Sequence, residues 1–502
     1  MTALLLLLLG LATTAISSYL LYTPSRKRTS NAPHLPAGLR QKLQHLGGMQ
    51  AYLYAGYRRH RQGAFQYRTL FGRQEVVVCS SALIRELGEA ANESMSFSAW
   101  TQKTLQLDYL FPGWNGGGGG GVAVAVNIPS FSMRVTHRWI RRTLVKELAA
   151  SFAGLWRDVV AGFGPGRLEL AGEIPPVYAL ARKCLIPAIA RYSVPAPLCE
   201  DAQFLATLDE LVYQIGTAGV VVGLFPEALK PWVVRYALSI QKSKQVVWEK
   251  LGRLAEEITP SSDATDHFSF GLGLIQRSNQ DNWTVDQLIS NTCIQLFAAF
   301  HTTATTLTMV LLELAVRPEY QHILREEAAG ISPTLDAMDS LWKLDSFIRE
   351  TRRFRPHVEI ILRRLVIKET TLSDGTVLTS GLNVAAAYGP RERDPRYYSA
   401  PDEFDGLRFY KLRMAALEGG ASGGGGGFMA TSTDGTEYLG FGAGKHECPG
   451  RFFAVATIKA VVVHLLSQYE LLPGSEPMQM TMRFEEQQLP SNKDRVIFKP
   501  LR

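Results

Sequence analysis

The sequence predicts a mostly α-helical fold with small β-sheets, arranged as one large domain behind an N-terminal membrane-spanning helix. Two long segments, 284–317 and 451–472, carry apolar residues at helical spacing. Short β-rich runs within 366–390 are interrupted by Asp-Gly and Ser-Gly turns, which indicates a small sheet. No composition shift marks a linker between two cores in the 502 residues, so we expect a single domain over 39–502.

The N-terminal segment reads as a retained membrane anchor. The run from Leu4 to Tyr22 is uncharged and, as a helix, would reach about 28 Å, roughly a bilayer core. The basic residues at 26–28 follow this run instead of preceding it, and no small-residue cleavage site is clear, which favours an anchor over a cleaved signal peptide. We therefore expect an anchor at 1–25, a basic and proline-rich hinge at 26–38, and the rest of the chain in the cytosol.

Composition excludes several classes of site. The five cysteines include no CxxC pair, which argues against a zinc site, an iron–sulfur cluster or a disulfide framework and implies a reducing compartment. The net charge of +7 is not concentrated in basic tracts, so nucleic-acid binding is not expected. The glycine runs at 115–121 and 419–427 lack the following Lys-Ser/Thr of a phosphate-binding loop, so we expect surface loops.

A glycine-rich stretch, FGAGKHECPG at 441–450, leads into the last long helix and holds a lone cysteine; we call it the cysteine loop. Its glycines allow positive φ or a close approach of the backbone to a flat, bulky group. We expect Cys448 at the helix N-terminus, where unpaired N–H groups favour a thiolate, and Pro449 at the first helical position. A thiolate is a nucleophile or a metal ligand. The alternative is a connector with an inert, buried cysteine.

The longest expected helix begins at a capping box of Thr284 and Gln287 and ends at Arg317, before Pro318. Its centre reads FAAFHTTATTLT, in which two alanines leave room for a flat ligand and the threonines offer hydroxyl groups. The alternative is a buried helix whose threonines bond to carbonyls one turn back.

A second helix is expected over SLWKLDSFIRETRRFRP, residues 340–356, ending before Pro356. Glu350 and Arg353 lie three residues apart and therefore on one face of this helix. Such a pair is usually solvated and contributes little to stability.

Taken together, four motifs resemble those of the cytochrome P450 family, the haem-thiolate monooxygenases. The cysteine loop fits the pattern F-x-x-G-x-x-x-C-x-G, and the other three are ETRR at 350–353, PDEFDGLRF at 401–409 and AAFHTT at 298–303. Their order and spacing are similar to those of the family. The resemblance covers essentially the whole chain, including the anchor, and implies a cytochrome P450 fold with the glycine runs as loop insertions.

The resemblance implies haem b as the cofactor and assigns roles around it. Cys448 would be the proximal ligand of the haem iron, Phe441 would pack beside the haem and the sulfur, and Gly444 and Gly450 complete the loop motif. His446 stands where the family usually has an arginine on a haem propionate. Further propionate partners left open are Arg363 or Arg364, and Arg138 or Arg142 near Trp139, where the usual W-x-x-x-R spacing is broken by Thr143.

The same resemblance assigns three other groups. Glu350, Arg353 and Arg408 would form a buried cluster beneath the haem, which replaces the solvated-pair interpretation. Thr302 matches the threonine that guides protonation during oxygen activation. His301 stands where the family normally has an acid; it either relays protons, as a histidine can near neutral pH, or fills space.

The implied activity is a monooxygenase that inserts one oxygen atom from O2. Electrons would come from NADPH–cytochrome P450 reductase, with cytochrome b5 as an additional partner, because the chain has no flavin or dinucleotide motif. HTT together with GKH-CPGRFFA is similar to membrane-bound enzymes of filamentous fungi that oxidise terpenoid or indole-diterpenoid skeletons in the endoplasmic reticulum membrane. Two alternatives stay open: a haem-thiolate enzyme that rearranges, couples or dehydrates its substrate, and a catalytically inactive membrane-bound binding protein.

Overall fold

The computed structural model describes residues 30–34, 49–69, 73–112, 131–164, 168, 174–194, 196–257, 284–420, 426–433, 438–474 and 478–501. The predicted anchor at 1–25 and the glycine run at 115–121 lie outside these residues, as does most of the second run. Residues 30–34, expected in the hinge, instead dock on the body: Ser30 pairs with Leu378 and His34 with Gln66.

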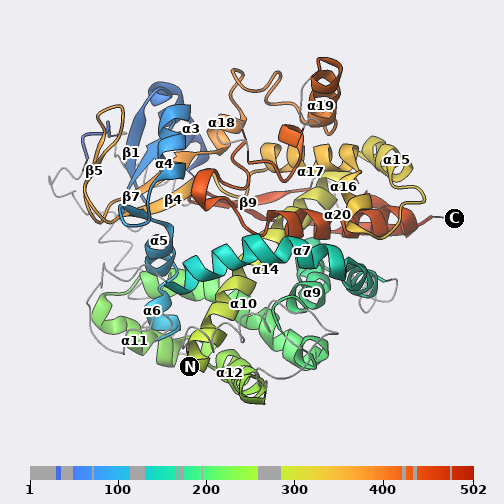
Figure 1. Ribbon diagram of the computed structural model, residues 1–502, viewed down its shortest axis with the longest axis horizontal. Coiled ribbons are helices and arrows are strands. Elements are labelled where there is room, and N and C mark those ends of the chain that lie inside the picture. The colour runs from blue at the N-terminus through green and yellow to red at the C-terminus, as the bar shows by residue number, and fades with distance from the viewer. Residues whose placement is uncertain are drawn as a thin grey trace.

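The predicted mostly helical architecture with small sheets is confirmed. The long helices occupy one part of the molecule, and the larger sheet lies at another side of it (Figure 1). The helical part contains α6 (Leu107–Leu110), α7 (Phe131–Gly162), α9 (Val177–Ala190), α10 (Ala202–Gly223), α11 (Lys230–Trp232), α12 (Ile240–Glu257), α14 (Val285–Ala315), α15 (Pro318–Glu327), α16 (Leu335–Asp339), α17 (Trp342–Phe354), α19 (Arg408–Glu418) and α20 (Arg451–Gln468).

The larger sheet has five strands in the order β1 (Ala64–Arg68), β2 (Gln74–Val78), β7 (Asn383–Ala387), β4 (Ile360–Val366) and β3 (Met95–Ser96), with β2 and β7 parallel. Three two-stranded sheets pair β5 (Thr370–Thr371) with β6 (Val377–Leu378), β8 (Tyr469–Pro473) with β11 (Val496–Pro500), and β9 (Thr481–Phe484) with β10 (Gln487–Pro490). Beside the large sheet lie α3 (Gln50–His60), α4 (Ser81–Glu89), α5 (Phe97–Thr104) and α18 (Gly389–Glu392).

The alternation of side chains along a strand explains how this sheet is buried on both faces. Val76 and Val78 pack in one core with Leu83 and Ile84 of α4, whereas Val77 packs in another with Leu53 of α3. The sheet is therefore held between the two helices α3 and α4.

Helix α14 runs through the centre of the helical part and packs against α9, α10, α12, α17 and α20. Its predicted capping box is present: the Thr284 hydroxyl accepts from the Gln287 N–H at 3.2 Å, and the Gln287 side chain accepts from the Thr284 N–H at 3.0 Å. The second predicted helix is α17. Helices α10, α14 and α20 are long and apolar enough to cross a membrane, yet 44%, 67% and 67% of their apolar windows is buried inside the protein, as expected for core helices.

Candidate functional site: the cysteine loop and the helices around it

The cysteine loop ends where α20 begins, but one residue-level prediction about this junction is wrong. Helix α20 starts at Arg451 with Gly450 as its N-cap, so Pro449 lies in the preceding turn and not at the first helical position. The Cys448 N–H donates to the carbonyl of Phe441 at 2.7 Å. This bond closes the loop on itself and fixes the cysteine two residues before the helix cap.

Two glycines of the loop take the positive φ that the sequence suggested. Gly442 and Gly444 have φ of 79° and 69°. A Cβ on Gly444 would lie 2.5 Å from the carbonyl oxygen of Gly88 at the end of α4, so the two backbones touch where no side chain fits. A Cβ on Gly450 would meet no heavy atom within 4 Å. The backbone beside Cys448 therefore leaves space that a flat group can occupy.

Cys448 is only partly covered by the protein around it and keeps accessible surface. Burial raises the pKa of its thiol, whereas a hydrogen bond from the Gly450 backbone and the positive charges of Arg352 and Arg451 oppose this rise. The helix end thus acts on the sulfur through the N–H of Gly450, but it does not offset burial. A coordinated metal ion removes the proton of a thiol outright, so this environment suits a metal ligand better than a free nucleophile.

Arg352 covers the loop from α17. Its guanidinium carbon lies 3.7 Å from the centre of the Phe441 ring, and its Nη2 donates to the carbonyl of Gly440. Arg352 therefore clamps the beginning of the cysteine loop. Arg352 lies inside the ETRR motif, which could have marked it as a candidate site residue. The spacing of the motif alone does not show that its side chain points towards the cysteine loop.

The predicted cluster of Glu350, Arg353 and Arg408 is present and buried. Arg353 donates to both carboxylate oxygens of Glu350 at 2.8 Å, and Arg408 Nε donates to the same carboxylate at 3.1 Å. The Glu350 and Arg353 side chains have 0% of their surface exposed. Both arginines also donate to backbone carbonyls of the 392–403 segment. The pair is thus not solvated, and it joins α17 to α19 and the segment before it.

On α14 a stripe of accessible residues crosses the middle of a mostly buried helix. Ala298 and Thr302 are exposed and Thr306 is partly exposed, at intervals of four residues, so they share one face. The Thr302 hydroxyl donates to the carbonyl of Ala298 at 2.8 Å, the local satisfaction that the alternative interpretation expected. This bond leaves the lone pairs of the hydroxyl oxygen available to accept a proton donor. Thr302 can therefore both face an open space and accept there.

Gln295, two turns before Thr302 on the same helix, was not found by sequence reasoning. Its amide oxygen and nitrogen are both buried and have no hydrogen-bond partner among the described residues. A buried amide without a partner is costly, so it indicates a polar group that the site is built to receive. Gln295 lies seven residues before Thr302, about two helical turns, so the sequence could have placed the two side chains on the same face of the helix.

His301 turns towards α9 and α10. Its Nδ1 lies 2.8 Å from the Tyr178 hydroxyl, and its ring stacks on Phe297 at 5.6 Å between centroids. Burial, and secondarily the charge of Arg182, lowers the pKa of His301 to about 4. The imidazole is therefore neutral near pH 7, and whether it relays protons stays a prediction.

The buried imidazole predicts acid sensitivity. The unfolded chain takes up this proton near pH 6.5 and the folded chain near pH 4, so the folded state loses stability as the pH falls through that interval. From pH 7 to pH 5 we expect this group to cost about 2 kcal/mol of unfolding free energy. In urea denaturation, the unfolding free energy of His301→Gln should fall less than that of wild type between pH 7 and pH 5, and the difference should equal this amount. His322→Gln, on the exposed face of α15, is the control, and its unfolding free energy should depend on pH as that of wild type does. If the unfolding free energy of His301→Gln depends on pH as steeply as that of wild type, the lowered pKa of His301 is wrong.

His357 lies in the turn after α17 and is partly accessible. Burial lowers its pKa to about 3, with further contributions from the positive charges of Arg352 and His301. His357 therefore lies close enough to both Arg352 and His301 for their positive charges to act on it.

The structure separates the two neighbouring arginines proposed for a propionate. A bulge in β4 between Ile361 and Arg364 breaks the alternation of the strand. Arg363 pairs with Glu75 at 2.9 Å and with Glu486, so its charge is already neutralised and we withdraw it as a propionate partner. Arg364 is 1% exposed, donates from Nη1 to the Arg363 carbonyl, and has no partner at Nε or Nη2 among the described residues. These two orphaned donors fit an anionic carboxylate.

Three further residues were predicted as propionate partners: His446, Arg138 and Arg142. His446 lies partly buried in a short 3₁₀ turn (Gly444–His446) of the cysteine loop. Arg138 and Arg142 belong to α7, but their side chains lie outside the described part of the chain. Their roles as propionate partners stay predictions.

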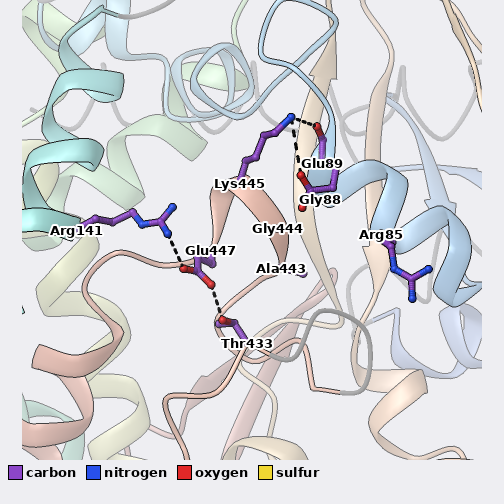
Figure 2. Close-up of a pocket in the computed structure, with 9 residues that line it drawn as sticks. All are labelled: Arg85, Gly88, Glu89, Arg141, Thr433, Ala443, Gly444, Lys445 and Glu447. Carbon is purple, nitrogen blue, oxygen red and sulfur yellow. Dashed lines mark hydrogen bonds and ion pairs between the residues drawn. The ribbon is translucent and has the colours of Figure 1, made fainter. Parts of the chain in front are cut away.

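The outer face of the cysteine loop borders a cavity of about 600 Å³. Figure 2 shows Arg141 of α7 and Thr433 converging on Glu447, while Lys445 reaches across to Glu89 at the end of α4. Arg141 pairs with Glu447 at 3.1 Å, and Lys445 donates to the Glu89 carbonyl at 2.9 Å. Arg85 also lines this cavity. A charged hollow therefore lies directly over the loop, on the side where it meets α4.

Comparison with known proteins agrees with these features. The chain matches the family described as Cytochrome P450 over residues 198–498. It is 28% identical over 429 residues to the cytochrome P450 monooxygenase janQ of Penicillium janthinellum, covering 83% of this chain and 82% of the relative. It is 29% identical over 475 residues to terQ of Tolypocladium album, covering 87% and 82%. Its fold is similar to that of a retinoic-acid-bound cyanobacterial protein, CYP120A1, with a TM-score of 0.65, 18% identity, and coverage of 92% of this chain and 96% of the other.

Proposed function

Because this chain belongs to the cytochrome P450 family and is a monooxygenase of that family, we propose that it inserts one oxygen atom from O2 into an apolar substrate, a terpenoid or a related fungal secondary metabolite. The observation that carries the proposal is Cys448, a cysteine that keeps accessible surface beside the open space at Gly450. Haem bound through such a thiolate supplies the oxygen-activating chemistry.

The residues present fit haem b. Cys448 would hold the iron, with its sulfur supported by the Gly450 N–H. The open space at Gly450 suits a flat macrocycle. The unpartnered Nε and Nη2 of Arg364 suit a propionate carboxylate, which would also neutralise a guanidinium whose pKa burial lowers to about 10. His446 and Arg142 are the further propionate partners of the proposal.

The proposed substrate class rests on the accessible face of α14. Apolar surface is presented there by Phe297, Ala298 and Ala299. The segment 295–306 of α14 contains no Asp, Glu, Lys or Arg. Such a lining suits a hydrocarbon skeleton, because apolar contacts dominate small-molecule sites. The unpartnered amide of Gln295 would orient one hydroxyl or carbonyl of that skeleton. The matched relatives from Penicillium and Tolypocladium are fungal cytochrome P450 monooxygenases, which supports a monooxygenase of fungal metabolism.

The proposal includes an electron donor and a location. NADPH–cytochrome P450 reductase, with cytochrome b5 as an additional partner, would deliver electrons over the charged hollow beside the cysteine loop. Arg85 of this hollow forms no ion pair among the described residues, and its charge suits an acidic group of the partner. The uncharged segment at 4–22 would hold the chain in the endoplasmic reticulum membrane as a single span, with the domain in the cytosol.

A labelling experiment tests this function. The metabolite that accumulates when the source organism lacks this protein is supplied, with NADPH, reductase and ¹⁸O2, to the full chain in lipid vesicles. We expect a product that carries one labelled oxygen atom. A converted but unlabelled product would instead indicate rearrangement, coupling or dehydration. Absence of conversion together with absence of a thiolate-type carbon monoxide band would indicate a binding protein.

Thr302 is predicted to couple electron use to product. In Thr302→Ala the hydroxyl on the accessible face of α14 is lost, so proton delivery at that face becomes unselective. We expect product per NADPH to fall severalfold while hydrogen peroxide release rises. Thr308→Ala is a matched control, because Thr308 makes the same bond one turn back, to Ala304 at 2.7 Å, but is fully buried. Equal coupling in both variants would remove Thr302 from the proposed mechanism.

A further inference from the structure

Arg352 carries an unusual buried charge. The residue is 6% exposed, and its Nη2 donates to the carbonyl of Gly440. Its Nε and Nη1 have no hydrogen-bond partner, and no carboxylate forms an ion pair with it, within the part of the chain that the structure describes. By contrast, Arg353 next to it is neutralised by Glu350 at 2.8 Å.

The position of this charge is defined by two contacts. The guanidinium carbon lies 3.7 Å from the centre of the Phe441 ring, and the Phe441 carbonyl accepts the Cys448 N–H at 2.7 Å. The charge therefore packs on Phe441, the residue whose carbonyl holds the Cys448 backbone. A desolvated cation without a carboxylate is costly, so its retention indicates an anion nearby. The charge of Arg352 acts on the Cys448 thiol and on the phenols of Tyr388 and Tyr438. Burial raises the pKa of both phenols, so they stay neutral, whereas a bound metal ion would hold the Cys448 sulfur as an anion.

We propose that Arg352 is the counter-cation of the Cys448 thiolate and raises the reduction potential of the iron that this thiolate holds. The inference rests on the proposed function for the identity of the ligand, and goes beyond it by assigning a residue that sets how readily the site accepts its first electron. That electron comes from the flavoprotein reductase, and no bond or proton is exchanged in the step.

The physical reason is electrostatic. Reduction lowers the positive charge at the iron by one unit, so a fixed cation close by favours the reduced state. The effect is strong because Arg352 is shielded from water by α17 and the cysteine loop. Stacking on Phe441 holds the cation in one orientation, and the bond to Gly440 stops it from swinging towards solvent.

The test compares Arg352→Gln, Arg352→Met and Arg352→Lys with wild type in the full chain loaded with haem. Spectroelectrochemical titration measures the ferric–ferrous midpoint, and the ferrous carbon monoxide spectrum reports the thiolate. We expect the Gln and Met variants to shift the ferrous-to-ferric ratio at fixed potential about tenfold towards ferric, about 59 mV for one electron. The Lys variant should stay close to wild type. Arg349→Gln is the matched control, since Arg349 is a buried arginine of the same helix that stacks on Phe409 and Tyr438 instead.

The outcomes separate this inference from the proposed function. A wild-type protein without a thiolate-type carbon monoxide band refutes the ligand assignment itself. With that band present, an unchanged midpoint in Arg352→Gln, or an equal shift in Arg349→Gln, overturns the role of Arg352 alone. If the Gln and Met variants fold but lose haem while the Lys variant keeps it, the charge is needed beside the sulfur and the proposal stands. If all three variants unfold even without haem, the residue is structural and the proposal fails.

Discussion

Replacing Cys448 with alanine is expected to abolish both the thiolate-type spectrum and substrate turnover. The Cys448 sulfur is the thiolate on this loop that would bind iron, and alanine leaves the backbone bond from residue 448 to the Phe441 carbonyl intact. Reduced carbon monoxide difference spectra and product formation measure the two losses. Thermal unfolding of the variant without haem should stay near that of wild-type apoprotein.

Cys199→Ala is the control for this experiment. Cys199 is buried in a short 3₁₀ helix (Leu198–Glu200) before α10, and it is not part of the cysteine loop. The spectrum and the turnover of this variant should be retained. Full turnover with a normal haem spectrum in Cys448→Ala would remove the ligand assignment and everything that depends on it.

The second large effect concerns stability. In the wild-type protein the Glu350 carboxylate lies 2.8 Å from Arg353 Nε and 3.1 Å from Arg408 Nε. Glu350→Gln leaves both guanidinium groups buried without this carboxylate. Removing one partner of a buried ion pair costs about 3–5 kcal/mol. We expect the free energy of unfolding, from guanidinium chloride denaturation, to fall by this amount.

Glu249→Gln is the matched control, because Glu249 pairs with Arg253 at 2.5 Å but the two side chains are 57% and 72% exposed. An exposed pair contributes little, so this variant should change the free energy by less than about 1 kcal/mol. A loss in Glu350→Gln no larger than in Glu249→Gln would mean that the cluster does not hold the 392–403 segment in place.

Sequence patterns predicted the elements that local chemistry determines. The capping box at Thr284 and the proline after Arg317 set the ends of α14 within two residues. The positive φ at Gly442 and Gly444 was expected because glycine is favoured there. Glu350 and Arg353 were placed on one face by spacing, whereas their burial could be anticipated through the resemblance and not through the pattern.

What the sequence could not predict depends on contacts between distant segments. The choice between Arg363 and Arg364 is made by the bulge in β4 and by Glu486, which is 123 residues from Arg363. The orientation of His301 is set by Tyr178 on another helix. The start of α20 was misjudged because Pro449 suits a first helical position as well as the turn that it occupies.

The contact between Gly88 and Gly444 has a mechanical consequence. Two peptide units touch there without an intervening side chain, and close-packed atoms compress little, so a displacement of the end of α4 is passed directly to the segment that carries the sulfur. A partner that presses on the charged hollow beside α4 would therefore also displace the backbone at Cys448. A larger residue at position 88 or 444 would force the two backbones apart and shift the cysteine loop in every molecule.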